Sequence, residues 1–292
     1  MDASHGFAGI ARTSLLARPP EPRQLACVDE ALALFVRRHD PDRFLTALFA
    51  PPARRDALLA LYAFNHELAR AREVVSEPPL ALIRLEWWRE VVEGAARRHE
   101  VASPLTAAMD NGSLWRNDLL AMIAAREIEA EPSIATLADW RNYVRDVAGG
   151  VAVAAGRALG AADPELLRPF GAAYGVAGVV RSMPTLAARG RCLLPEDLLH
   201  AHGLSAEAAI AAPTSPLVRK VLSVLVPEGQ AQLARAATVR LPRSAVAAAL
   251  PAVLARRDLA VWSAPPRPRG LGDRFAVLLA AMRGKPVPRR PS

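Results

Sequence analysis

Apolar residues recur along most of this chain at the three- and four-residue spacing that is typical of helices. Proline or glycine separates the apolar blocks, and none of them shows the sustained alternation of apolar and polar residues expected of strands. The pattern therefore predicts an all-α protein, with helices over residues 24–38, 52–77, 79–97, 116–130, 136–160, 164–188, 214–237, 243–262 and 270–283.

The distribution of proline and glycine also predicts one large domain between two less ordered ends. Residues 1–22 mix Gly, Ser, Arg and Pro without periodicity, which indicates a flexible N-terminal arm. From residue 263 the chain becomes rich in proline and arginine, which predicts a basic tail over 263–292 that contains one short helix. No linker interrupts residues 23–262, so we expect a single helical domain there, long enough to bury a sizeable core.

The composition agrees with close-packed helices and excludes several other classes. Hydrophobic residues make up 52% of the 292 residues and aromatic residues only 5%, so most of the apolar content is Ala, Leu and Val. Cys27 and Cys192 lie far apart and outside any CxxC pattern, which argues against a disulfide framework or a zinc site. Without a long apolar run or a secretory signal, the sequence predicts a cytoplasmic protein, with peripheral contact at the inner face of the cytoplasmic membrane left open.

The formal net charge of +8 favours an anionic partner such as a membrane surface or a diphosphate, although a solvated arginine-rich surface explains it equally well. Aromatic residues are not interleaved with the basic ones, so we expect no nucleic-acid partner.

The short basic helix near Arg274 suits either packing onto the bundle or contact with a membrane. No nucleotide-binding motif is present. Trp87 and Trp88 point about 100° apart on a helix, so we expect at least one of them in the core.

Four segments, taken together, carry a resemblance to a known family. In order along the chain they are Arg43–Pro51 with Ala60–Phe64, then Leu85–Arg89, then Val147–Val151, and last Gly171–Arg181 followed by Arg189–Leu198. Their order and separation resemble the squalene/phytoene synthase family. The resemblance implies the isoprenoid synthase fold, in which a helical bundle surrounds a central cavity that holds two isoprenoid chains in the enzymes.

The family's enzymes hold magnesium ions, which bridge to the substrate diphosphate, with acidic motifs on two facing helices. Here the resemblance places the first motif on Ala69, Arg70 and Glu73, with Glu77 following, and the second on Ser182, Thr185 and Leu186. Because magnesium binds oxygen donors, alanine and leucine cannot replace carboxylates. We therefore expect no catalytic residue, no metal site and no cofactor.

Two further expectations concern charged side chains near these motifs. Glu73 and Glu77 share a helix face and could hold one ion, but pairing of Arg70 with Glu73, in a surface ladder with Arg72, is favoured. Guanidinium groups bind oxyanions well, so a second expectation is an anion site formed by Arg181, Arg189 and Arg191. A buried Arg181 that is satisfied by carbonyl groups, next to a solvated turn, is the equally weighted alternative.

Two stretches that differ from the motifs of the family's enzymes resemble the sequence of one branch of the family. The stretch Ala63–Ala69 with Arg72–Ser76, and Arg181–Pro184 in place of the second motif, resemble the mitochondrial complex I assembly factor that carries a phytoene-synthase-like domain. This resemblance implies a pseudoenzyme that helps to assemble respiratory complex I (NADH dehydrogenase) at the membrane, with complex I subunits or assembly intermediates as partners.

Two alternatives stay open at this point. The first is an active transferase that joins two farnesyl or geranylgeranyl diphosphates head to head, with magnesium. It would need acids elsewhere to replace the lost aspartates, namely Glu67, Glu73, Glu77 and Asp146. The second is a non-catalytic lipid-binding protein, with a membrane lipid or an isoprenoid in the cavity.

Overall fold

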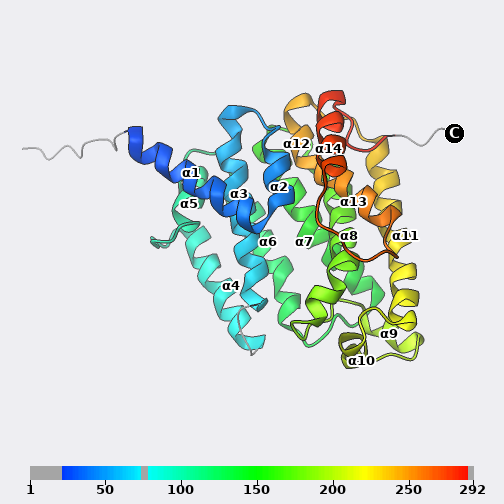
Figure 1. Cartoon of the computed structure of the whole chain (residues 1–292). Coiled ribbons are helices and arrows are strands. Elements are labelled where there is room, and N and C mark those ends of the chain that lie inside the picture. Colours follow the sequence, from blue (N-terminus) through cyan, green and yellow to red (C-terminus); the bar gives the residue numbers. More distant parts are fainter. Residues whose placement is uncertain (1–21, 74–77, 289–292) are drawn as a thin grey trace, which may run out of the picture.

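The computed structural model describes residues 22–73 and 78–288, and over these residues the protein is built from helices alone (Figure 1). The described part of the chain contains no strand, and its one isolated bridge joins Ile134 to Pro195. The predicted all-α class is thus confirmed. None of the described helices has the length and apolar content required to span a bilayer.

Most predicted helices are present with small shifts at their ends. The helices of the structure are α1 Pro22–His39, α2 Pro41–Ala47, α3 Pro52–Glu73, α4 Pro78–Glu93, α5 Ala102–Asp110, α6 Arg116–Arg126, α7 Leu137–Ala158, α8 Arg168–Ala187, α9 Glu196–Ala201, α10 Ala206–Ala211, α11 Pro216–Thr238, α12 Val246–Ala249, α13 Pro251–Ala260 and α14 Leu271–Arg283. Three 3₁₀ turns accompany them, η1 Glu127–Ala130, η2 Pro164–Leu167 and η3 Arg243–Ala245.

Several predicted boundaries differ from the structure for local reasons. The helix expected over 79–97 ends at Glu93, because Gly94 takes a φ of 117° that helical residues do not adopt. The helix expected over 243–262 is divided into η3, α12 and α13, and Pro251 begins the last of these. The short helices α2, α5, α9 and α10 were not predicted at all. The expected arm lies almost entirely outside the described residues, and the domain limits stay predictions.

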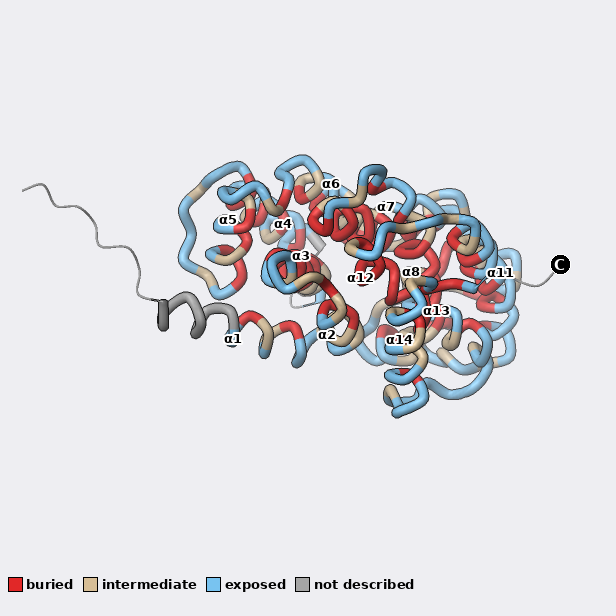
Figure 2. Tube along the Cα trace, turned by 90° about the horizontal axis from the view of Figure 1, so that it is seen from above, coloured by how far each residue is buried: buried red, intermediate tan, exposed pale blue. Residues whose placement is uncertain are grey.

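Helix α8 lies at the centre of the bundle, packed against α7, α11 and α13. Its contact with α7 depends on small residues, since a Cβ atom at Gly171 would collide with the carbonyl oxygen of Ala148. Buried residues concentrate along α3, α7 and α8 (Figure 2). Trp88 belongs to this core with 2% of its surface exposed, which confirms the expectation for the tryptophan pair.

Residues 261–270, which we call the strap, connect α13 to α14. Arg269 anchors the strap through ion pairs with Asp42 on α2, at 2.7 Å, and with Asp258 on α13, at 2.6 Å. Arg181 on α8 also donates a hydrogen bond of 2.6 Å to the carbonyl oxygen of Arg267. The strap is thereby tied to three helices before α14 packs back on α13.

Candidate functional site

A cavity of about 310 Å³ lies where α3 and α8 face each other, with α7 and η1 completing its wall. We call it the motif cavity, because its lining includes positions that the family resemblance assigns to both motifs: Ala69 and Glu73 from α3, and Ser182, Thr185 and Leu186 from α8. Helical spacing explains this arrangement, since residues three or four apart share a helix face. Among the described residues of the first motif, Arg70 is not in the lining, and Glu77 lies outside the described residues.

Next to these positions the motif cavity contains a buried polar cluster centred on Glu129. Arg126 lies 2.5 Å from Glu129 and Arg191 lies 3.0 Å from it, and the hydroxyl of Tyr143 donates to the same carboxylate over 2.9 Å. Burial by itself would raise the pKa of Glu129, but the two guanidinium groups outweigh burial and hold that pKa below its ordinary value. The cluster is therefore an ionised carboxylate held between two cations.

Arg43 adds a further cation to the lining of the motif cavity. Its guanidinium lies 4.9 Å from the ring centre of Tyr174 and 2.8 Å from the carboxylate of Asp40. Burial would lower the pKa of Arg43, but the nearby Asp40 and Tyr174 more than compensate and raise it. Arg43 is therefore a permanent charge that already has an acidic partner.

The three arginines of the expected anion site do not share one location. Arg189 and Arg191 line the motif cavity, where Arg189 pairs with Glu73 at 2.6 Å and Arg191 with Glu129. Arg181 instead turns toward the strap and lies 3.6 Å from Asp258. Each guanidinium thus has an oxygen partner from the protein, and anion binding by these residues stays a prediction.

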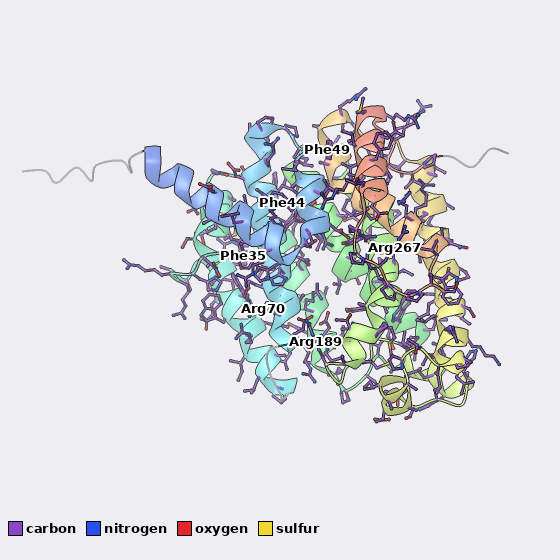
Figure 3. The ribbon with its side chains drawn as sticks, in the orientation of Figure 1. Phe35, Phe44, Phe49, Arg70, Arg189 and Arg267 are labelled. Atoms are coloured by element: carbon purple, nitrogen blue, oxygen red, sulfur yellow. The ribbon has the colours of Figure 1, made fainter. Side chains whose placement is uncertain are left out.

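The expected pairing of Arg70 with Glu73 is wrong. Arg70 lies 3.2 Å from Glu67, one turn earlier on α3, while Glu73 reaches across to Arg189. Figure 3 labels the two arginines, Arg70 and Arg189. The cause is the position of Arg189 at the end of α8, which offers Glu73 a partner from another element. Sequence spacing along one helix cannot reveal a partner of this kind.

The residues present do not fit a magnesium-bound diphosphate. Ala69 and Leu186 offer no donor atoms, and the carboxylates of Glu73 and Glu129 are already paired with arginines. Within residues 22–73 and 78–288, no group of three or more His, Cys, Asp or Glu is placed to hold a metal ion. The acids of the transferase alternative are also dispersed, since Asp146 pairs with Arg145 and lines no part of the motif cavity.

A second cavity of about 880 Å³, the strap cavity, adjoins the first and lies between α2, α8, α13 and the strap. Tyr174, Gly178, Ser182 and Thr185 of α8 line both cavities. The Asp42–Arg269–Asp258 ion pairs belong to the strap cavity. Neither the Arg269 ion pairs nor the Glu129 cluster was predicted from the sequence, because each joins residues that are far apart along the chain: Asp42 and Arg269 are 227 residues apart, and Glu129 and Arg191 are 62 residues apart.

Comparison with known proteins gives a consistent result. The family model described as squalene/phytoene synthase matches residues 36–275. The NADH dehydrogenase (ubiquinone) complex I assembly factor 6 of Mus musculus is 27% identical over 227 residues, which cover 75% of this chain and 68% of the mouse protein. Its Homo sapiens counterpart is 27% identical over 180 residues, so this chain spans about half (54%) of the human protein.

Two solved structures have the same fold at low sequence identity. A dehydrosqualene synthase in complex with a ligand has a TM-score of 0.71 at 14% identity, over 89% of this chain and 97% of that one. A squalene synthase from Alicyclobacillus acidocaldarius has a TM-score of 0.61 at 20% identity, over 90% of this chain and 97% of that one. These likenesses establish the isoprenoid synthase fold.

Proposed function

Because this chain belongs to the squalene/phytoene synthase family, we propose that it is a non-catalytic member that helps to assemble respiratory complex I at a membrane. One observation carries the proposal. The two helices that face each other across the motif cavity present Ala69 and Leu186 at motif positions, and the remaining acid, Glu73, is paired with Arg189. Such a cavity lacks the donors that a metal-bound diphosphate requires.

The relatives favour assembly over synthesis. The solved structures named as synthases support the fold, and fold alone does not determine function. The sequence relatives whose names specify a function are complex I assembly factors. We therefore propose complex I subunits or assembly intermediates as the partners of this chain.

Helix α14 supports the membrane location in this proposal. Leu271, Phe275, Leu278 and Met282 follow one another at helical spacing, and they are 82%, 64%, 40% and 65% exposed. The opposite face of α14 packs on α13 through Val277. An exposed apolar stripe of this kind marks an interaction surface.

The charges beside this stripe favour an anionic bilayer. Arg274, Arg283 and Lys285 are exposed, and none of them forms an ion pair with a carboxylate of the described residues. The only acid of α14, Asp273, is buried and paired with Arg257. Apolar side chains flanked by unpaired cations suit binding in the plane of an anionic membrane surface, which we propose to be the inner face of the cytoplasmic membrane.

The assembly role is tested by deleting the gene and measuring assembled complex I on native gels. We expect less assembled complex, restored by the wild-type gene and equally by Glu73→Gln, because a non-catalytic protein does not need that carboxylate for chemistry. Normal complex I in the deletion strain would contradict the assembly role. Rescue by wild type but not by a stably folded Glu73→Gln protein would favour a catalytic role.

The membrane contact is tested by sedimentation with phosphatidylcholine vesicles that contain or lack phosphatidylglycerol. We expect sedimentation with the anionic vesicles, weakened by Phe275→Asp. Leu217→Asp is the matched control, since Leu217 is 40% exposed on α11, outside the stripe. Equal sedimentation of both variants, or none of the wild type, would contradict the assignment to α14.

A further inference from the structure

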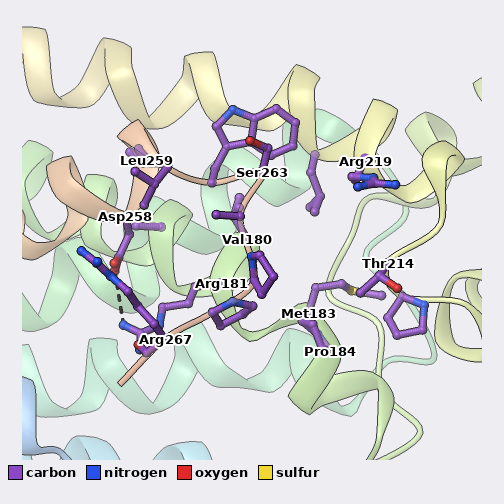
Figure 4. A pocket seen from close by; sticks show the side chains of 18 residues that line it. Val180, Arg181, Met183, Pro184, Thr214, Arg219, Asp258, Leu259, Ser263 and Arg267 are labelled. Carbon is purple, nitrogen blue, oxygen red and sulfur yellow. Dashed lines mark hydrogen bonds and ion pairs between the residues drawn. The ribbon is translucent and has the colours of Figure 1, made fainter. Parts of the chain in front are cut away.

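A third cavity, of about 460 Å³, shares no lining residue with the motif cavity. Figure 4 shows the side chains that line this third cavity. We call it the outer cavity. Its walls come from α8, the start of α11, the end of α13 and the strap. Two neighbouring residues show the separation, because Val179 lines the motif cavity while Val180 lines the outer cavity. The outer cavity is thus distinct from the place where the degenerate motifs meet.

The interior of the outer cavity is apolar. Its lining includes aliphatic, thioether, proline and indole side chains, among them Val180, Met183, Pro184, Leu222, Leu259 and Trp262. The volume falls within the range of roughly 300–1,000 Å³ that is usual for small-molecule sites. A methylene group is close to a water molecule in size, at about 30 Å³, so the cavity has room for one chain of roughly fifteen carbons and not for two.

The charged groups at the rim are mostly cations. Arg219 and Arg267 are exposed, and neither side chain forms an ion pair with a carboxylate of the described residues. The only acid in the lining is Asp258, which is bound by Arg269 from the strap at 2.6 Å and lies 3.6 Å from Arg181. The rim therefore offers two arginines that are not neutralised by a carboxylate of the described residues, next to an apolar interior.

We propose that the outer cavity binds a single-chain anionic amphiphile, of which a long-chain fatty acid is the simplest. The chain lies against the apolar lining and the anionic head group meets Arg219 at the rim, where a guanidinium donates two hydrogen bonds to a carboxylate or a phosphate. A diphosphate requires several cations at one point. Arg219 and Arg267 are separated from each other, so they suit a singly charged head group better. This inference does not depend on the role in complex I assembly.

The first test measures binding of radiolabelled myristic acid, a chain that matches the volume of the cavity, by equilibrium dialysis with the purified full-length protein. Val180→Phe fills the outer cavity, and Val179→Phe is its matched control because the two valines are equally buried, at 6% exposure, but line different cavities. We expect Val180→Phe to weaken binding at least tenfold and Val179→Phe to change it less than twofold. Absence of binding to the wild type, or the opposite ranking of the variants, would overturn the proposal.

A second variant keeps the test decisive if Val180→Phe does not fold. Arg219→Ala alters only an exposed side chain, and we expect it to weaken binding of myristic acid about fivefold while leaving the affinity for its methyl ester unchanged. Equal effects on acid and ester would overturn the assigned head-group contact. Displacement of the probe by palmitate and by palmitoyl lysophosphatidate, measured separately, then identifies the preferred head group. Failure of both to displace it would refute the proposed ligand class.

Discussion

Glu73 on α3 and Arg189 at the end of α8 form an ion pair in which Oε2 and Nη1 lie 2.6 Å apart. The pair joins α3 to the turn that follows α8, and α3 and α8 are the two helices on which the family resemblance places the acidic motifs. The two sides of the motif cavity are therefore connected by an ion pair.

This ion pair should contribute little to stability. The side chain of Arg189 is 51% exposed and that of Glu73 is 27% exposed, so water screens their attraction. A double-mutant cycle with Glu73→Gln and Arg189→Gln, followed by urea unfolding, is expected to give a coupling energy below about 1 kcal/mol. Magnesium should leave the unfolding midpoint of the wild type unchanged. A clear magnesium-induced rise that Glu73→Gln abolishes would show a metal site instead.

The buried cluster around Glu129 should behave differently. The side chain of Glu129 is 4% exposed, and Glu129→Gln would leave Arg126 and Arg191 as buried cations without a counter-ion. We expect a loss of about 3 kcal/mol in the free energy of unfolding, measured with urea. Glu131→Gln is the control, since Glu131 is exposed and should change stability by less than about 0.5 kcal/mol. Similar small losses in both variants would refute the buried-charge account.

His66 should make stability depend on pH. Its ring stacks on His39 with 4.6 Å between centroids, and burial, followed by the neighbouring His39, lowers the pKa of His66. The unfolded chain then binds a proton more readily, so the stabilising effect of neutral His66 is complete above about pH 6.5 and declines as the pH falls toward the lowered pKa.

The measurement is urea unfolding of wild type and His66→Leu at about pH 7.5 and about pH 5. The stability lost through His66→Leu should be smaller at the lower pH. His200→Leu is the control for loss of an exposed histidine, because the side chain of His200 is 61% exposed. A larger loss at the lower pH for His66→Leu would reverse the predicted sign.

Arg269 should hold the strap in place. Its side chain is 17% exposed between Asp42 and Asp258, which are 15% and 18% exposed. Arg269→Ala would leave the largely buried Asp42 without an ion-pair partner and Asp258 with only the more distant Arg181, at 3.6 Å. We expect a loss of about 3 kcal/mol and faster proteolysis within residues 261–270. Arg267→Ala is the control, because only the backbone oxygen of Arg267 is used by Arg181. Equal protease resistance of the two variants would contradict this anchoring.

The sequence was sufficient for the helical class and for the long helices, because apolar residues at helical spacing mark each of them. It also placed Ala69 and Ser182 on one shared site through the family resemblance, and both line the motif cavity. The short helices α2 and α5 were missed because two or three turns give too little periodicity.

What the sequence could not provide are partners that are distant along the chain. Glu129 and Arg191 are 62 residues apart, and Asp42 and Arg269 are 227 residues apart. No local spacing marks these pairs. The error over the partner of Glu73 has the same origin, because Glu73 pairs with Arg189, which is 116 residues away. The outer cavity could not be predicted from the sequence either, because its lining comes from α8, α11, α13 and the strap together.

The most direct test of the central claim is turnover of labelled farnesyl and geranylgeranyl diphosphate by the purified protein, with magnesium and with or without NADPH. The absence of catalytic donors in the motif cavity predicts no coupled product and no release of diphosphate above the rate without protein. Magnesium-dependent formation of a head-to-head product, abolished by Glu73→Gln, would contradict the non-catalytic account.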